Sequence, residues 1–216
     1  MKKLVIFDLD GTLLNTIADL AHSTNYALNK LGYPTHEIEK YNFMVGNGID
    51  KLFERALPEE EKSKENVLRV RKEFVPYYDI HNADDSRPYP GIPKLLSYLQ
   101  DAGIQIAVAS NKYQAATQKL IDHYFPEIHF TAVFGQREGI KVKPDPTVVF
   151  DILEVAKVTK EEVLYVGDSG VDMQTAANAG VTVCGVTWGF RPRAELEEFS
   201  PQYIVDTAEE IKRLIL

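Results

Sequence analysis

The 216-residue chain contains one cysteine and no long apolar run, and these two features limit the classes of protein to which it can belong. Cys184 has no partner within the chain, so no intrachain disulfide can form, and its apolar neighbours favour a packing role. No apolar stretch approaches the ~20 residues of a membrane-spanning helix. Acidic residues directly follow the short apolar run of the N-terminal MKKLVIFDLDG, which indicates a first strand and not a signal peptide. We therefore expect a cytoplasmic protein.

Positive charge is also scarce, with 24 Lys and Arg residues against 32 Asp and Glu residues and a net charge of −8. A field of this sign repels nucleic acids and anionic membrane surfaces, so we expect neither as a partner. The content of 44% apolar and 26% charged residues is that of an ordinary globular protein. If the substrate is an anion, a bound cation and a few local basic groups must overcome the overall field.

Short apolar runs alternate with segments of helical period along most of the chain. We expect strands at 3–9, 104–110, 132–135, 162–168, 181–186 and 203–205, with amphipathic helices between most of them. Buried strands that alternate with helices predict a parallel sheet covered on both faces. The expected fold class is therefore α/β, with a Rossmann-like parallel core.

The region from 15 to 84 breaks this alternation, and we expect no strand in it. One helical stripe carries Ile17, Leu20, Ala21, Thr24, Leu28 and Leu31, and a second helical stretch from 49 to 80 has a break near Pro58. The region begins shortly after the first strand and closes at the Pro- and Gly-rich residues 86–91. An all-helical insertion at such a place suggests a lid. We therefore expect a core of residues 1–14 and 85–216 and a helical cap of residues 15–84.

Polar residues collect at the carboxyl ends of the expected strands, where parallel sheets bind their ligands. These residues are Asp8, Asp10 and Thr12 after the first strand, Ser110, Asn111 and Lys112 at the second, Lys141 and Lys143 after the third, and Asp168 and Asp172 after the fourth. Each group also has a simpler interpretation. Asp8 and Asp10 could be a fragment of a calcium loop, and Ser110 could be a helix N-cap. Lys143 could be a solvated loop residue, and GDSGVD could be a turn with an Asp cap. Their joint occurrence favours one shared site.

Phosphoryl transfer is the chemistry that these residue types suit. Paired carboxylates in oxygen-only surroundings fit Mg²⁺, with Asp8 and Asp168 on opposite sides and Asp172 either a ligand or behind the ligands. Asp8 can attack phosphorus and form an aspartyl-phosphate, while Asp10 acts as general acid and then as general base. Ser110 and the amide groups of the following helix suit an anion, and Lys143 offsets negative charge at the reacting group.

Four ordered motifs, DLDGTL, the Ser110 of VASN, the Lys143 of KVKPDP, and GDSGVD, resemble those of haloacid dehalogenase-like hydrolases. The resemblance covers nearly the whole chain. It implies Asp8 as nucleophile and Asp10 as acid/base, with the backbone carbonyl of Asp10 also on Mg²⁺. It further implies that Ser110 and Lys143 bind the phosphate, that Asp168 binds the metal, and that the helical insertion is a cap that closes over small substrates.

The segments VGNGIDKLFERAL and GVTWGF resemble phosphoglycolate phosphatases in particular. This implies Mg²⁺-dependent hydrolysis of a small phosphorylated metabolite, a phosphoglycolate-like phosphomonoester. We expect the substrate to meet Thr12, Ser110, Asn111, Lys143, Gly46 and Asn47, and the metal to meet Asp8, Asp10, Asp168 and Asp172. Asn15 departs from the family pattern, where many relatives carry Asp at the cap hinge. Lys51 and Arg55 could also face the substrate, but a solvated helix face explains them equally well.

Other interpretations share most of these residues. A phosphosugar phosphatase, a pyrophosphatase, a β-phosphoglucomutase or a phosphonatase of the same family remains open. Such mutases tend to carry a cap His where this chain has Leu20, and phosphonatases need a cap Lys, for which Lys30 and Lys51 are candidates. A signalling receiver also combines an acidic Mg²⁺ pocket with Ser or Thr and Lys, but it is usually half this length and has no cap. The sequence gives no interface signal, so we expect a monomer or a homodimer.

Overall fold

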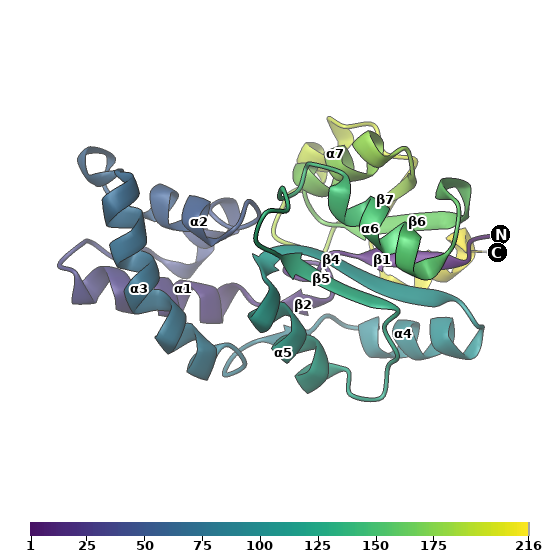
Figure 1. Cartoon of the computed structure of the whole chain (residues 1–216), viewed down its shortest axis with the longest axis horizontal. Helices are drawn as coiled ribbons and strands as arrows, with labels where there is room; N and C mark the ends of the chain where they lie inside the picture. Colours follow the sequence, from purple (N-terminus) through teal and green to yellow (C-terminus); the bar gives the residue numbers. More distant parts are fainter. Residues whose placement is uncertain (216) are drawn as a thin grey trace.

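The computed structural model describes residues 1–215, which form a large sheet-containing part and a smaller helical part beside it (Figure 1). The sheet has six strands: β1 Leu4–Phe7, β4 Gln105–Tyr113, β5 Ala132–Gln136, β6 Val163–Gly167, β7 Thr182–Val186 and β8 Tyr203–Val205. All six pair in parallel in the order β5-β4-β1-β6-β7-β8. The six strands lie where the sequence predicts them, and the expected α/β fold class is confirmed.

The central strand β1 places the polar residues of three strands side by side. It pairs with β4 on one side and β6 on the other, and Phe7 lies opposite both Val108 and Val166. All four residues of β1 are buried, because helices cover both faces of the sheet. The chain crosses from β1 to strands on either side of it, and such a switch point opens a crevice at the carboxyl ends of the strands.

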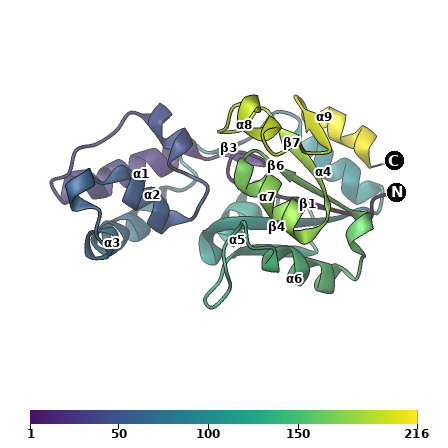
Figure 2. The same cartoon turned by 90° about the horizontal axis from the view of Figure 1, so that it is seen from above.

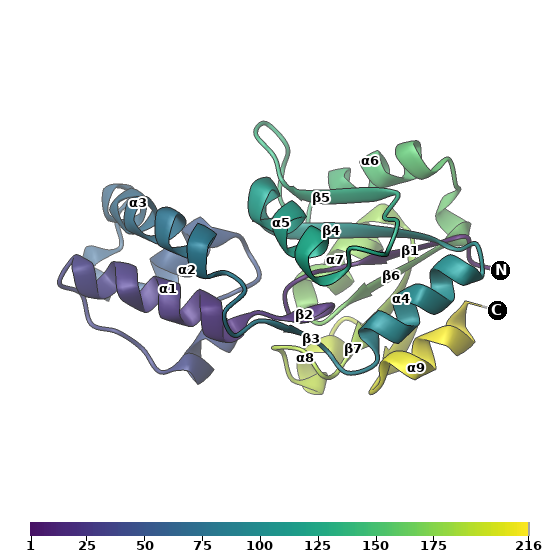
Figure 3. The same cartoon turned by 90° about the horizontal axis from the view of Figure 1, so that it is seen from below.

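Helices fill the two faces with separate apolar cores. One face carries α4 (Ile92–Asp101), α5 (Gln114–Tyr124) and α9 (Ala208–Ile211); the other carries α6 (Thr147–Ala156), α7 (Gly170–Ala179) and α8 (Arg193–Glu197) (Figures 1 and 3). Val5 and Phe7 join the first core, whereas Leu4 and Ile6 join the second, as the period of two along a strand requires. Cys184 is buried in the first core, as expected.

The helical part contains α1 (Ile17–Lys30), α2 (Ile49–Ala56) and α3 (Lys64–His81), together with the 3₁₀ turns η1 (Ile38–Phe43) and η2 (Glu59–Glu61) (Figure 2). The remaining 3₁₀ turns are η3 (Lys160–Glu162) and η4 (Lys212–Leu214). The predicted stripe of α1 packs into a core shared by the three helices, which includes Leu20, Leu28, Phe53 and Phe74. None of the helices within residues 1–215 has the length and apolar character needed to cross a bilayer.

Two chain segments join the helical part to the sheet. They form the antiparallel strands β2 (Leu14–Asn15) and β3 (Arg87–Pro88), so the expectation of no strand from residue 15 onward is wrong at its first residue. A two-residue strand whose partner lies some seventy positions away has no periodicity to detect.

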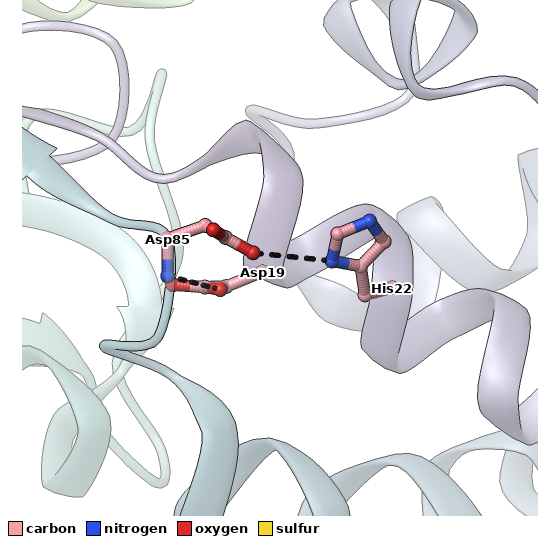
Figure 4. A group of neighbouring side chains, drawn as sticks. All are labelled: Asp19, His22 and Asp85. Atoms are coloured by element: carbon pink, nitrogen blue, oxygen red, sulfur yellow. Dashed lines mark hydrogen bonds and ion pairs between the residues drawn. The ribbon is translucent and has the colours of Figure 1, made fainter.

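Asp19, in the first turn of α1, fastens the returning chain beside this ribbon. Its carboxylate accepts hydrogen bonds from the backbone N–H groups of Asp85 and Ser86 (2.9 and 2.8 Å) and from the Ser86 hydroxyl (2.6 Å). His22 Nδ1 lies 3.5 Å from Asp85 Oδ2 on the exposed side of this contact (Figure 4). The start of α1 and the chain that leaves α3 are therefore tied together.

Candidate active site

The carboxyl ends of β1 and β6 and the start of α7 bring three carboxylates together. An oxygen of each of Asp8, Asp168 and Asp172 lies within 4.8 Å of the others, and all three side chains are buried. A glycine on each side makes room for Asp168. A Cβ on Gly11, whose φ is +92°, would lie 2.3 Å from Asp168 Oδ2, and a Cβ on Gly189 would lie 2.2 Å from Asp168 Cβ.

Lys143 balances part of this buried negative charge. Its Nζ lies 2.8 Å from Asp8 Oδ1, 2.7 Å from Asp172 Oδ1, 2.9 Å from the Ala109 carbonyl oxygen and 3.2 Å from the Tyr165 hydroxyl. An ammonium has three hydrogens, so its donor capacity is used in full. Burial alone would lower the pKa of Lys143, but Asp172 and Asp8 outweigh burial and hold that pKa well above its usual range. Lys143 is therefore a fixed cation beside Asp8.

One lysine does not neutralise three carboxylates. Burial raises the pKa of Asp8 to about 7, with Asp172 adding to the effect and Lys143 opposing it. Burial, followed by Asp172 and Asp8, also raises the pKa of Asp168 well above its usual range. The ionised cluster is therefore costly without a further cation.

The donor set at this cluster fits a hard cation. The ligand atoms that the three carboxylates offer are all oxygens, and among residues 1–215 Asp8 Oδ2 has no hydrogen-bond donor. Asp168 accepts from the backbone N–H of Phe190 (2.7 Å) and from the Thr12 hydroxyl (3.3 Å), which holds its carboxylate toward Asp8. Asp8 and Asp168 are the residues that could hold Mg²⁺.

Asp172 is engaged differently from these two. Its Oδ1 accepts from Lys143 and from the Tyr165 hydroxyl (3.1 Å), and its Oδ2 accepts from the backbone N–H (3.2 Å) and the hydroxyl (2.6 Å) of Ser169. Four donors saturate a carboxylate. The sequence left open whether Asp172 is a metal ligand or lies behind the ligands. This bonding favours the second alternative, in which Asp172 holds Lys143 in place.

Asp10 lies on the side of the site that faces the helical part. Its Oδ1 accepts a hydrogen bond from the Thr16 hydroxyl (2.7 Å) and lies 3.0 Å from Lys112 Nζ. Sequence reasoning assigned no role to Lys112. The available signal was its position, because Lys112 follows Ser110 at the carboxyl end of the same strand, where ligands bind.

A small cavity of about 30 Å³ lies between the sheet and the helical part. Its walls are Asp8, Asp10, Ser110, Asn111 and Lys112 from the sheet side, and Leu20, Val45, Gly46, Gly48, Ile49 and Leu52 from the helical side. The helices contribute no charged side chain to it. Of the residues expected at the leaving-group end, Gly46 is present and Asn47 is absent.

Comparison with known proteins agrees with this geometry. The family model for haloacid dehalogenase-like hydrolases matches residues 5–186. The chain belongs to the haloacid dehalogenase-like hydrolase family. It is 32% identical to a phosphoglycolate phosphatase of Mesorhizobium japonicum (99% of this chain, 97% of the relative) and 31% identical to one of Vibrio parahaemolyticus (99% and 96%). A crystal structure of a predicted phosphoglycolate phosphatase from Haemophilus somnus superposes with a TM-score of 0.92 at 29% identity, covering 100% of this chain and 98% of that one.

Three details of this haloacid dehalogenase-like hydrolase differ from the expectations. Strand β4 continues to Tyr113 and α5 begins at Gln114, so Ser110 is not a helix N-cap and the free amides of α5 do not adjoin it. The Ser110 Oγ instead accepts a hydrogen bond from the Lys112 N–H (3.1 Å). The residues of the bulge that extends β4 are polar and vary in size, so no apolar pattern in the sequence predicts this extension.

The second difference is that the Asn111 amide clamps backbone on both sides of the site. Its Oδ1 accepts from the Lys143 N–H (2.8 Å), and its Nδ2 donates to the carbonyl oxygens of Lys143 and Gly46 (3.0 Å each). Its polar atoms therefore hold the Lys143 loop and the Gly46 loop at the wall of the cavity.

The third difference concerns the residues that follow Gly46. The Asn47 Oδ1 accepts from Arg55 Nη2 (2.8 Å), and Asn47 lines a separate cavity of about 580 Å³ beside Arg191. Lys51 pairs with Glu54 (2.6 Å) on an exposed helix face. The structure thus favours the solvated interpretation of Lys51.

Proposed function

We propose that this hydrolase cleaves a small phosphomonoester of the phosphoglycolate type, with Mg²⁺ and through an aspartyl-phosphate on Asp8. The observation that carries the proposal is the buried cluster in which Asp8 faces Asp168 while Lys143 holds one Asp8 oxygen. The phosphoglycolate phosphatases that share about a third of their residues with this chain support the substrate class.

Asp8 and Asp168, with the backbone carbonyl of Asp10, would hold the Mg²⁺. The ion supplies positive charge that offsets the carboxylates and orients a phosphate oxygen. Asp172 acts through Lys143, which it holds beside the nucleophile. The Ser110 hydroxyl keeps its proton free to donate to the phosphate, because its oxygen serves as acceptor for Lys112 N–H.

Each half of the reaction uses the two aspartates of the first motif. An Asp8 oxygen forms a bond to phosphorus, the bond from phosphorus to the ester oxygen breaks, and a proton passes from Asp10 to the leaving oxygen. Water then attacks the phosphorus and gives its proton to Asp10, the Asp8–phosphorus bond breaks, and phosphate leaves. Lys143 remains charged throughout and offsets the negative charge at Asp8.

The helical segment of residues 15–84 would act as the cap over a core of residues 1–14 and 85–216. A cavity of about 30 Å³ leaves little free space for a phosphate ester between the sheet and the helices. Substrate entry therefore requires the helices to move away from the sheet. The short β2–β3 ribbon is where this motion would bend, because it is the place where both crossing segments pair.

Two of the alternative activities lack support at the cavity. Leu20 lines it where a mutase of this type tends to carry a cap His, and His22 lies outside it beside Asp85. The phosphonatase candidates Lys30 and Lys51 pair with Glu73 and Glu54 outside the cavity. These contacts favour a phosphatase.

The experiment is phosphate release from a panel of small phosphomonoesters that includes 2-phosphoglycolate, with Mg²⁺ and with EDTA. We expect Mg²⁺-dependent release by the wild type and by Asp101→Asn, which changes an exposed carboxylate far from the site, and no release by Asp8→Asn. The rank order among the esters identifies the substrate. Turnover that survives in Asp8→Asn, or no release from any ester, would refute the proposal.

A further inference from the structure

Lys112 is a buried cation at the boundary between the sheet and the helices. Its side chain is 2% exposed, and its Nζ lies 3.0 Å from Asp10 Oδ1. The same Nζ lies 4.9 Å from the centre of the Tyr78 ring, which belongs to α3 of the helical part. The ammonium is therefore enclosed by one carboxylate of the core and one aromatic face of the helices.

This ammonium has donors to spare, in contrast to Lys143. Among residues 1–215 its only side-chain oxygen contact is to Asp10, whereas Lys143 meets four oxygens. The Tyr78 hydroxyl is buried and also has no hydrogen-bond partner within the described chain. A buried charge with unused donors is costly, so the free energy of the site improves if a further anion reaches Lys112.

Within the described chain, Lys112 is also the single cationic side chain that lines the small cavity. The charged residues beside it are Asp8 and Asp10, and the helical side supplies only apolar groups and glycines. An anionic leaving group would be repelled there by two carboxylates in surroundings of low dielectric constant. Lys112 is the group that can reverse this repulsion.

We propose that Lys112 binds a carboxylate of the leaving group, so that the enzyme selects small phosphate esters with a second negative charge near the ester oxygen. This inference rests on the proposed phosphatase function. A general acid contacts the leaving oxygen at about 3 Å, and Lys112 contacts that acid, Asp10, at 3.0 Å. Lys112 Nζ then lies within about 6 Å of the ester oxygen, a span that a leaving group of two or three carbons with a terminal carboxylate can bridge.

The same contact would release Asp10 for its task. When the substrate carboxylate pairs with the Lys112 ammonium, Asp10 loses this cationic partner but keeps the hydrogen bond from the Thr16 hydroxyl (2.7 Å). Asp10 can then turn toward the leaving oxygen. A substrate without the second charge leaves Asp10 paired with Lys112, so selection acts on the chemical step as well as on binding.

The test compares kcat/KM for 2-phosphoglycolate with kcat/KM for 2-hydroxyethyl phosphate, an ester of the same length whose leaving group is neutral. We expect the wild type to favour 2-phosphoglycolate, and Lys112→Gln to lower that preference about 10- to 100-fold, because a charge-assisted hydrogen bond is lost. Lys112→Arg, which keeps the charge, is expected to retain most of the preference. Lys51→Gln is the matched control, and its preference should equal that of the wild type.

The outcomes separate this inference from the phosphatase proposal. Equal turnover of both esters by the wild type would overturn the role of Lys112 while leaving the phosphatase intact, and this result needs no variant. A preference that survives in Lys112→Gln, or that collapses in Lys51→Gln, would also overturn it. Lys112→Met provides a second neutral variant with the same expectation should Lys112→Gln fail to fold by circular dichroism. No release from either ester would overturn this inference, whereas only the absence of release from every ester of the panel would remove the phosphatase proposal as well.

Discussion

Asp8→Asn should abolish activity and at the same time stabilise the metal-free protein at alkaline pH. Asp8 is buried, and its ionised form is disfavoured because burial raises its pKa to about 7. The amide has the same shape, cannot ionise, and keeps an oxygen that can accept the hydrogen bond from Lys143. It therefore mimics the neutral acid at every pH.

The pKa shift of Asp8 sets the size of this effect. Burial moves the pKa of Asp8 from its ordinary value of 3.8 to about 7, a change that corresponds to about 4 kcal/mol. A raised pKa in the folded state adds stability below pH 4, and that stability is lost as the pH rises toward and through 7. The wild type thus loses up to about 4 kcal/mol over this window, and less where the coupled carboxyl of Asp168 takes up part of the proton binding. Asp8→Asn keeps this part of the free energy of unfolding, because its amide does not ionise.

Urea unfolding in EDTA at pH 4 and pH 8 measures this difference. We expect the free energies of unfolding of the wild type and Asp8→Asn to be nearly equal at pH 4 and to diverge at pH 8, with the variant more stable by about 2–4 kcal/mol. Asp101→Asn, at an exposed position, should follow the wild type at both pH values. A variant that is no more stable than the wild type at pH 8 would refute the claim that Asp8 is strained as an anion.

Three further predictions test the same site. Mg²⁺ should raise the melting temperature of the wild type, more at pH 8 than at pH 5 because the carboxylates must be ionised to bind it; an equal rise in Asp168→Asn would contradict the metal assignment. Lys143→Met should lower the free energy of unfolding by about 3–5 kcal/mol at pH 7, measured in urea, since Asp8 and Asp172 lose their buried partner; a loss below 1 kcal/mol would count against a buried ion pair. Gly189→Ala should cost about 1–3 kcal/mol and reduce the thermal response to Mg²⁺, because the new methyl group would overlap Asp168; an unchanged response would disprove that contact.

The sequence could predict the sheet because each strand is a local feature. Buried strands such as β1 and β6 are continuous apolar runs, and the polar residues that follow them end the run at a visible place. Since parallel strands end at one edge, the approach of Asp8 to Asp168 followed from topology alone. The core stripe of α1 was visible for the same reason, through its period of 3.6.

Pairings between distant side chains could not be predicted in this way. The clamp of Asn111 on Gly46 and the contact of Lys112 with Tyr78 join residues that are remote in sequence, and they depend on how the helices settle on the sheet. The orientation of Asn47 depends on whether Arg55 reaches its amide, which side-chain packing decides. Periodicity reports which face of an element is buried, but it does not report which residue lies opposite.

The β2–β3 ribbon has a consequence for how such an enzyme can change. Because Leu14–Asn15 and Arg87–Pro88 pair side by side, the chain leaves the sheet and returns to it at a single place. The sheet keeps its strand order whatever lies between these two segments, just as a domain tolerates an insertion whose ends are adjacent. The helices could therefore be lengthened, replaced or redesigned for a new substrate while the residues that handle phosphorus remain where they are.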